Sequence, residues 1–266
     1  MQQLKTLLHS ADCLLITAGA GMGVDSRLPD FRGNSGMWQA YPELGRQQID
    51  FTSIANPQAF AKNPRLAWGF YGHRLVLYRK TMPHAGFEYL LKIAEHLDLP
   101  YFVFTSNVDG QFAKAGFDPE RIYECHGSIH HLQCTQSCCD EIWTADITPV
   151  IDNDKCLWLG ELPSCPQCGG LARPNILMFG DWHWIGARSD EQESRLQAFL
   201  GKHQNPVVIE MGAGTAIPTV RCFGERFAPN LIRINPRDNA LSARGGISLP
   251  MGAKAGVEMI WQSLIG

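Results

Sequence analysis

Residues 13 to 23 read CLLITAGAGMG, a continuous apolar run that ends in glycines. Such a run is typical of a strand buried on both faces of a parallel sheet, followed by a loop at the carboxyl end of that strand. The same pattern recurs in YFVFTS (101–106), PVVIEMGAG (206–214) and LIRIN (231–235), and segments with helical periodicity separate these runs. Strands that alternate with helices predict an α/β fold with a doubly wound parallel sheet.

The composition is that of a globular protein, with 45% hydrophobic and 18% charged residues among 266. A chain of this length can form one large core with a small appendage. The formal net charge of -3 argues against a nucleic-acid partner, because a phosphate-binding face is usually strongly basic. The first apolar run is interrupted by His9, Ser10 and Asp12, which argues against a signal peptide, and no run is long enough to span a membrane. We therefore expect no membrane association and a cytoplasmic location.

The cysteines favour a metal site over a disulfide framework. There are nine in total, an odd number, and five of them lie in a single stretch: Cys134, Cys138, Cys139, Cys165 and Cys168. The pairs Cys134-x3-Cys138 and Cys165-x2-Cys168 have the spacing of two knuckles that hold one Zn²⁺ tetrahedrally. Four sulfur ligands leave no open position, so the predicted zinc is structural. Two alternatives remain: Cys139 could replace Cys138 as a ligand, or the thiols could cluster by chance.

The glycine loop at residues 19 to 23 suggests a binding site for a pyrophosphate, since glycines allow backbone amides to come close to phosphates at the start of a helix. By itself the loop is equally consistent with a tight turn, because the third glycine of the common dinucleotide motif is replaced by Val24. The continuation DSRLPDFRG (25–33) adds arginines that can neutralise phosphate and Phe31, which can cover an apolar face of a sugar or base.

The run GAGMGVDSRLPDFRG (19–33) resembles the NAD-binding signature of the sirtuin family. Further matches follow in the order of that family along nearly the whole chain: TSNVDG (105–110), ECHGS (124–128), the cysteine module, RPNILMFGD (173–181), GAGTAIP (212–218) and RIN (233–235). The resemblance implies a Rossmann-like sheet with a smaller inserted zinc-binding domain. It also implies an enzyme that consumes NAD to remove acyl groups from the lysines of protein or peptide substrates, releasing nicotinamide and O-acyl-ADP-ribose.

The resemblance implies a set of residues that bind NAD as a co-substrate. Asn107 would orient the nicotinamide ribose, and Asp109 would hold the nicotinamide carboxamide. Two positions depart from the family pattern, since Ser106 stands where most sirtuins have glutamine and Ala216 replaces a common serine. The implied cofactor-binding residues are Gly19, Ala20, Gly21, Asp30, Phe31, Arg32, Ser106, Asn107, Asp109, Gly212, Gly214, Thr215 and Asn235.

The family match also selects the catalytic residues, His126 and Asn107. His126 is chosen over the neighbouring His130 and His131, and its role would be to take a proton from a ribose hydroxyl. The ordinary pKa of histidine, close to neutrality, suits this role. Without the resemblance, a structural or merely exposed histidine would be the more common interpretation.

Residues 64–80 have helical periodicity and contain Tyr71 and Arg74, which share one helical face. This pair resembles the Tyr-x-x-Arg pair that lets some sirtuins accept malonyl, succinyl or glutaryl lysine, because an arginine fork can pair with an acyl carboxylate. The alternative is a solvated helix face. The resemblance further places Phe179 and Gly180 among the substrate-binding residues.

We expect three chain segments, 1–30, 84–127 and 176–266, to form the Rossmann-like NAD-binding domain. Residues 31–83 would form the cofactor loop and the helical part of the small domain, and residues 128–175 would form the zinc-binding module. Two other functions compete with deacylation. The departures at Gly23, Arg27, Ser106, Gln111, Phe112 and Ala216 would suit an ADP-ribosyltransferase or NAD hydrolase. A non-enzymatic NAD-sensing scaffold is the third hypothesis.

Overall fold

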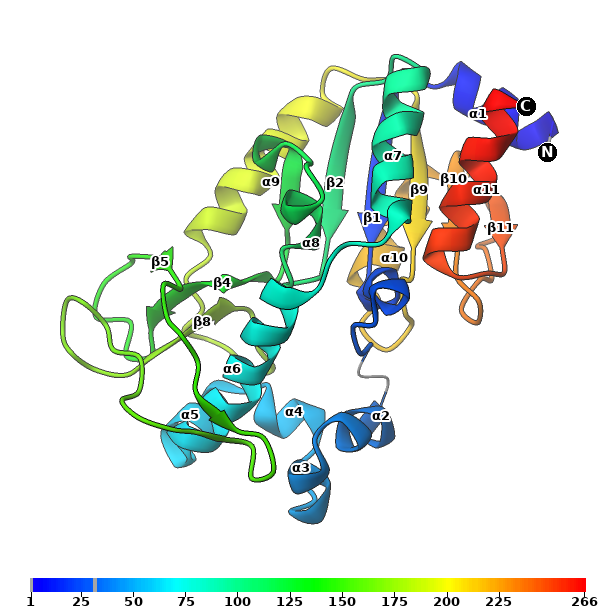
Figure 1. Cartoon of the computed structure of the whole chain (residues 1–266). Coiled ribbons are helices and arrows are strands. Elements are labelled where there is room, and N and C mark those ends of the chain that lie inside the picture. The colour runs from blue at the N-terminus through cyan, green and yellow to red at the C-terminus, as the bar shows by residue number, and fades with distance from the viewer. Residues whose placement is uncertain (1, 31–32) are drawn as a thin grey trace.

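The computed structural model describes residues 2–30 and 33–266. Its main sheet has the strand order β11-β10-β9-β1-β2-β3, and all neighbouring strands in it run parallel (Figure 1). The prediction of a parallel α/β sheet is confirmed. The strands are β1 (Cys13–Ala18), β2 (Tyr101–Thr105), β3 (Ile122–Glu124), β9 (Pro206–Met211), β10 (Leu231–Ile234) and β11 (Ile247–Leu249).

Helices cover both faces of this sheet. Successive side chains of a strand point to opposite faces, so neighbouring residues of one strand pack into different clusters. On β1, Leu14 and Ile16 belong to one buried cluster and Leu15 belongs to another. The first cluster lies under α1 (Gln2–Ser10), α7 (Ala85–His96) and α11 (Ala253–Ile265), and the second lies under α9 (Ala187–Leu200) and α10 (Thr219–Gly224). The short elements of this part are η1 (Ala20–Ser26), α8 (Gln111–Lys114), η2 (Pro119–Arg121) and η3 (Glu225–Phe227).

A second group of elements lies beside the carboxyl ends of these strands (Figure 1). It is built on α6 (Pro64–Lys80), which runs from this group toward the main sheet, and on an antiparallel sheet of order β5-β4-β8. The indole N–H of Trp68 on α6 donates to the carbonyl of Ala172 on β8 at 2.9 Å, which joins the two within one core. The remaining members are α2 (Gly33–Ala40), α3 (Pro42–Arg46), α4 (Phe51–Ile54), α5 (Pro57–Lys62), β4 (Gly127–Cys134), β5 (Trp143–Thr144), β6 (Ile151–Asp152), β7 (Leu157–Trp158) and β8 (Ala172–Ile176).

None of the helices in residues 2–30 and 33–266 combines the length and the apolar character that crossing a bilayer requires.

Candidate active site

A cavity of about 780 Å³ lies at the carboxyl ends of β1, β2 and β9, between the two groups of elements. Open α/β sheets bind ligands at this edge. The cavity is lined by most of the residues that the sequence singled out: Gly19, Ala20, Gly21, Asp30, Tyr71, Arg74, Ser106, Asn107, Asp109, His126, Phe179, Gly212, Gly214 and Thr215. Phe31 and Arg32 fall outside the described residues.

The glycines after β1 have a packing role that the sequence did not reveal. A Cβ atom on Gly21 would lie 2.6 Å from the Cα of Gly212, so the loops after β1 and β9 can meet only if this position has no side chain. The amide of Gly21 donates to the carbonyl of Gly212 at 3.0 Å. The close contact holds the two loops together along one wall of the cavity.

Asn235 and Gly180 are not among the residues that line the cavity. The side chain of Asn235 is buried, and its amide donates to the carbonyl of Ala213 at 3.0 Å. Its oxygen accepts from the backbone amides of Arg237 and Asp238 at 3.0 and 2.9 Å. Asn235 therefore links the loop after β10 to the loop after β9 and supports the cavity wall from behind.

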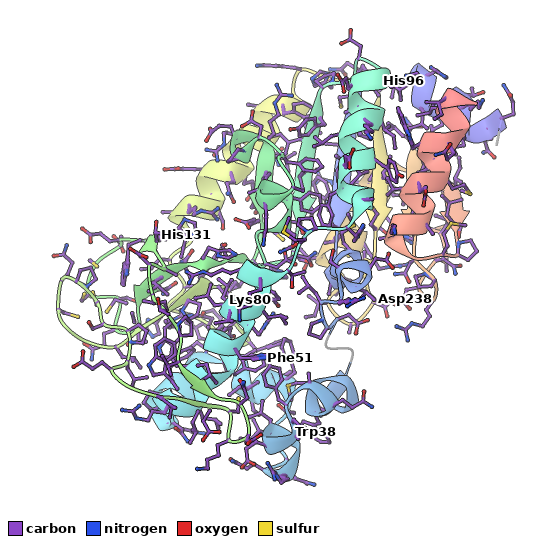
Figure 2. All side chains as sticks on the ribbon, in the orientation of Figure 1. Trp38, Phe51, Lys80, His96, His131 and Asp238 are labelled. Carbon is purple, nitrogen blue, oxygen red and sulfur yellow. The ribbon has the colours of Figure 1, made fainter. Side chains whose placement is uncertain are left out.

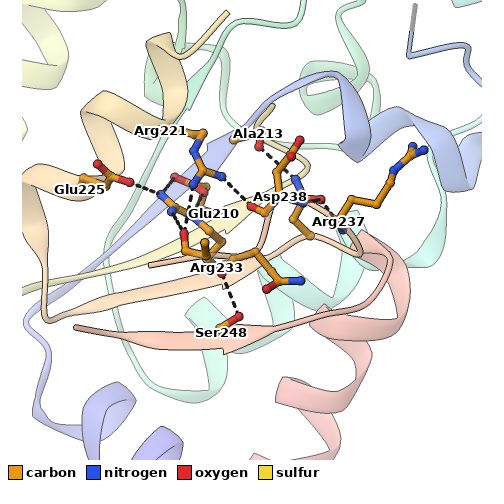
Figure 3. A network of polar contacts seen from close by, with 11 residues as sticks. Glu210, Ala213, Arg221, Glu225, Arg233, Arg237, Asp238 and Ser248 are labelled. Atoms are coloured by element: carbon orange, nitrogen blue, oxygen red, sulfur yellow. Dashed lines mark hydrogen bonds and ion pairs between the residues drawn. The ribbon is translucent and has the colours of Figure 1, made fainter. Parts of the chain in front are cut away.

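A buried ion-pair network lies behind this wall (Figure 3). Arg233 on β10 lies directly opposite Glu210 on β9, pairs with its carboxylate, and also contacts Glu225 at 3.1 Å. Arg221 donates to the carbonyl of Asp238, a residue that lines the cavity, at 2.6 Å. Sequence reasoning missed this network, because the two charges lie inside strands that otherwise read as apolar.

His126 lies in the turn between β3 and β4. A Cβ on the following residue, Gly127, would lie 2.2 Å from the carbonyl oxygen of Asn175, so only glycine fits at position 127. The carbonyl of His126 accepts from the amide of Leu177 at 3.0 Å, which fixes the turn against β8. Burial lowers the pKa of the imidazole below its ordinary value of 6.5. The ring is therefore neutral at neutral pH and able to accept a proton.

Nε2 of His126 lies 3.5 Å from the hydroxyl oxygen of Thr219 at the start of α10. No sequence pattern indicates this contact, because the two residues are far apart in the chain.

Asn107 and Asp109 follow β2. The side-chain amide of Asn107 donates to the carbonyl of Gly19 at 3.0 Å, and this bond ties the loop after β2 to the glycine loop. The carboxylate of Asp109 accepts from the amide of Gln111 at 3.0 Å. Burial raises the pKa of Asp109 to about 6, although the hydrogen bond from Gln111 and the charge of Arg74 act in the opposite direction.

Tyr71 and Arg74 are buried, with 1% and 8% of their surfaces exposed. The solvated helix face considered from the sequence is therefore wrong. The guanidinium of Arg74 donates to the hydroxyl of Tyr78, from Nε at 2.9 Å and from Nη2 at 2.7 Å. Tyr78 also lines the cavity and was missed, although its spacing of four residues from Arg74 places it on the same helical face.

The segment that holds Phe179 is fixed on both sides. The amide of Phe179 donates to the carbonyl of Ala55 at 2.9 Å, and its ring meets Phe51 edge-on at 5.8 Å. Two residues further on, Asp181 forms a buried ion pair with Arg173 at 2.8 Å. Phe179 is thus presented to the cavity by a segment tied to both α4 and β8.

The thiols of Cys134, Cys138, Cys165 and Cys168 all lie within 4.8 Å of one another. Cys134 and Cys168 have sulfurs 3.7 Å apart, and Cys138 and Cys165 have sulfurs 3.6 Å apart. Zinc-to-sulfur bonds of about 2.3 Å in a tetrahedron hold sulfurs about 3.8 Å apart, so the four thiols fit Zn²⁺. Cys139 lies outside this group of four, and its sulfur is 3.8 Å from that of Cys138.

Comparison with known proteins gives concordant results. The model of the Sir2 family matches residues 19–197. An NAD-dependent protein deacylase of Aquifex aeolicus is 27% identical over 254 residues, which cover 94% of this chain and 95% of the relative. The NAD-dependent protein deacylase 1 of Archaeoglobus fulgidus is 32% identical over 179 residues, which cover 67% of this chain and 64% of the relative.

Two solved structures share the fold. A Sir2 homologue in complex with NAD has a TM-score of 0.76 at 24% identity, and the match covers 100% of this chain and 94% of that one. A Sir2 protein bound to an acetylated peptide has a TM-score of 0.68 at 18% identity, and the match covers 99% of this chain and 98% of that one. At these identities the likeness concerns the fold alone.

Proposed function

The chain belongs to the Sir2 family, and on that premise we propose that it removes acyl groups from lysine side chains of proteins, releasing nicotinamide and forming O-acyl-ADP-ribose. It is an NAD-dependent protein deacylase in the general sense of its relatives. One observation carries the proposal: His126, Asn107 and Asp109 line the same cavity as the two glycine loops.

The loops after β1 and β9 bind the pyrophosphate side of NAD in this proposal. They are held together by the contact between Gly21 and Gly212. Apart from its chain neighbours, no described residue has an atom within 4 Å of the place where a Cβ of Gly214 would lie, so ligand atoms can come close to its backbone. Asp109 lines the same cavity, close enough to Arg74 for that charge to lower its pKa, and binds the nicotinamide carboxamide in this proposal. NAD supplies the ribose that receives the acyl group.

His126 is the general base. Its ring is neutral because burial lowers its pKa, so it can take a proton from a ribose hydroxyl without first losing one. The contact with Thr219 at 3.5 Å restricts the rotation of the ring. Asn107 is the second catalytic residue, and its bond to Gly19 fixes its side chain beside the glycine loop.

The acyl-lysine enters between the Phe179 segment and α6. We propose that Tyr71 and Arg74 recognise acidic acyl groups such as succinyl, glutaryl or malonyl. A buried guanidinium on the cavity wall, oriented by the hydroxyl of Tyr78, can form a bidentate pair with a carboxylate. An acetyl group has no carboxylate and therefore cannot form this pair with Arg74.

The zinc is structural, held by Cys134, Cys138, Cys165 and Cys168. We propose that residues 31–83 and 128–175 form one small domain around it, and that the remaining segments form the NAD-binding domain. A shared core supports this division, since Met37, Trp68, Leu132 and Ala172 belong to one buried cluster.

The decisive experiment is incubation of the protein with NAD and a panel of acetyl, malonyl, succinyl and glutaryl versions of one peptide, followed by mass spectrometry. O-acyl-ADP-ribose together with free lysine supports deacylation. Free ADP-ribose or ADP-ribosylated protein without deacylated peptide would instead support the competing hydrolase or transferase. If Arg74→Met lowers the rate with succinyl peptide and not with acetyl peptide, the acidic preference is supported; if acetyl is the best substrate and Arg74→Met changes nothing, that preference is wrong.

A further inference from the structure

A second cavity, of about 340 Å³, lies next to the candidate active site. Tyr78 and Asp109 line both cavities, so these residues form part of the wall between them. The rest of the second cavity is formed by Arg79 on α6, Gly110, Glu124 on β3, and residues of α8, β4 and the start of α9. Of these elements, α8, β3, β4 and α9 contribute no residue to the lining of the first cavity. It is therefore a separate site.

Cationic side chains from three different helices meet in the second cavity: Arg79 on α6, Lys114 on α8 and Arg188 on α9. Arg79 donates to the carbonyls of Ile147 and Ala145, and Lys114 donates to the carbonyls of Arg79 and Thr81 at 2.6 and 2.7 Å. These contacts fix the two side chains in place without neutralising their charge, because carbonyl groups carry no net charge.

Arg188 adds an unfilled hydrogen-bonding position. Its Nη2 pairs with the carboxylate of Glu124 at 2.6 Å, whereas its Nη1 is buried and has no hydrogen-bond partner among the described residues. Nδ1 of His131 on β4 is likewise buried and has no hydrogen-bond partner among the described residues. His131 is labelled in Figure 2. A buried N–H without a partner is unfavourable. Because Nη1 is enclosed by protein, a ligand in the cavity would reach it only through a small shift of the Arg188 side chain, and that shift would give this N–H a partner.

Two acids, Asp109 and Glu124, also line this cavity, so its charges must be weighed against each other. Glu124 is already paired with Arg188. Burial lowers the pKa of His130, its hydrogen bond with the carbonyl of Asp109 acts in the opposite direction, and the charges of Arg79, Lys114 and Arg188 lower the pKa further. Burial, Arg188 and His130 lower the pKa of His131 to about 4, so its ring is neutral and its partnerless nitrogen can donate or accept.

We propose that this second cavity binds a small anion that carries a carboxylate or phosphate group, paired with the side chains of Arg188 and Lys114, which both line it. The volume of about 340 Å³ suits a small organic acid or a phosphorylated metabolite. Arginine is suited to both groups, because its planar fork matches carboxylate and phosphate oxygens. The proposal does not depend on the chemistry of the first cavity.

The test is calorimetric titration of inorganic phosphate and, separately, of succinate into the protein saturated with ADP-ribose, which occupies the cofactor part of the first cavity. Saturable binding of either probe is expected, and Arg188→Gln and Lys114→Met should each weaken it about tenfold, as expected for the loss of a charge-assisted contact. Lys80→Met is the matched control, because Lys80 is an exposed neighbour of Arg79 that does not line the cavity (Figure 2). It should leave the affinity unchanged.

Arg188→Gln removes the partner of Glu124 and can disturb folding, whereas Lys114 is exposed and Lys114→Met should fold normally. The proposal is overturned if neither probe binds up to about 10 mM. It is also overturned if Arg74→Met abolishes binding while Lys114→Met has no effect, since the anion would then occupy the first cavity. Which of the two probes binds more tightly identifies the ligand as a phosphate or a carboxylate.

Discussion

Arg74 donates two hydrogen bonds to one oxygen atom, the hydroxyl of Tyr78, which lies one turn further along α6. Both residues are buried and both line the main cavity. Two bonds to a single oxygen fix the plane of the guanidinium against the cavity wall. Tyr78 therefore acts as a positioning residue for Arg74, and its contribution can be measured separately from that of the charge.

Tyr78→Phe removes the hydroxyl that accepts both bonds from Arg74, and it should lower kcat/KM for a succinyl-lysine peptide about 2- to 10-fold while changing the acetyl reaction less. The charge of Arg74 remains in this variant, so the loss should be smaller than that of Arg74→Met. The matched control is Tyr89→Phe, which removes a tyrosine hydroxyl on α7, away from the cavity. Equal losses with both acyl groups would show that Tyr78 supports the fold in general.

His126→Ala should abolish deacylation while leaving the protein folded, because general-base catalysis typically contributes about 100- to 10,000-fold. Kinetics with the preferred acyl peptide, together with circular dichroism, tests this. His96→Ala, an exposed histidine on α7, is the control and should retain full activity. Near-normal turnover by folded His126→Ala protein would remove His126 from the mechanism.

The sequence predicted the fold well because the decisive patterns are local. The apolar run that begins at Cys13 is strand β1, and the helical period of residues 64–80 is helix α6. Helix α9 begins at Ala187, and no side-chain cap marks its start, so its first residue could not be located from the sequence. Local periodicity thus identified the elements better than it located their ends.

The site was less predictable, since depth and partners depend on contacts between distant segments. Helical spacing placed Tyr71 and Arg74 on one face, but their burial results from packing against other elements. Arg233 and Glu210 form a pair only because β9 and β10 are neighbours in the sheet. Asn235, for which a cofactor contact is predicted, also binds the backbone of the adjacent loop, and no sequence motif reveals that contact.

The pH dependence of kcat/KM should show an acid limb with a midpoint below 6.5. Protonation of His126 removes the base, and burial lowers the pKa of this group, so the base remains available at pH values where an exposed histidine would be charged. Asp109, with a pKa of about 6, ionises in the same range, and the observed midpoint therefore belongs to both groups. A midpoint above 6.5 would contradict the assignment of His126 as a buried neutral base.

Cys138→Ser should lower the zinc content and destabilise the small domain, whereas Cys139→Ser should leave one zinc per chain. The two residues are adjacent in sequence, which makes them a matched pair. Elemental analysis gives the metal content, and thermal unfolding gives the stability, which should also fall when a chelator removes the zinc. The opposite pattern for the two serines would assign the fourth position to Cys139.

Asp109→Asn should stabilise the protein at pH 8 while impairing the reaction with NAD. Burial raises the pKa of Asp109 from 3.8 to about 6 in the folded state. The carboxyl is protonated in both states at low pH, but as the pH rises the unfolded chain ionises first, so ionisation progressively favours unfolding. The free energy of unfolding therefore loses a contribution between about pH 4 and pH 6, and the asparagine variant does not lose this contribution.

Asparagine also keeps an oxygen that can accept from the amide of Gln111. We expect a gain of roughly 1 to 3 kcal/mol at pH 8 and a smaller gain at pH 5, measured by denaturant unfolding without NAD. A gain that is independent of pH would mean that the folded state does not raise the pKa of Asp109. A loss at pH 8 would mean that Arg74 stabilises the carboxylate of Asp109 more strongly than burial destabilises it.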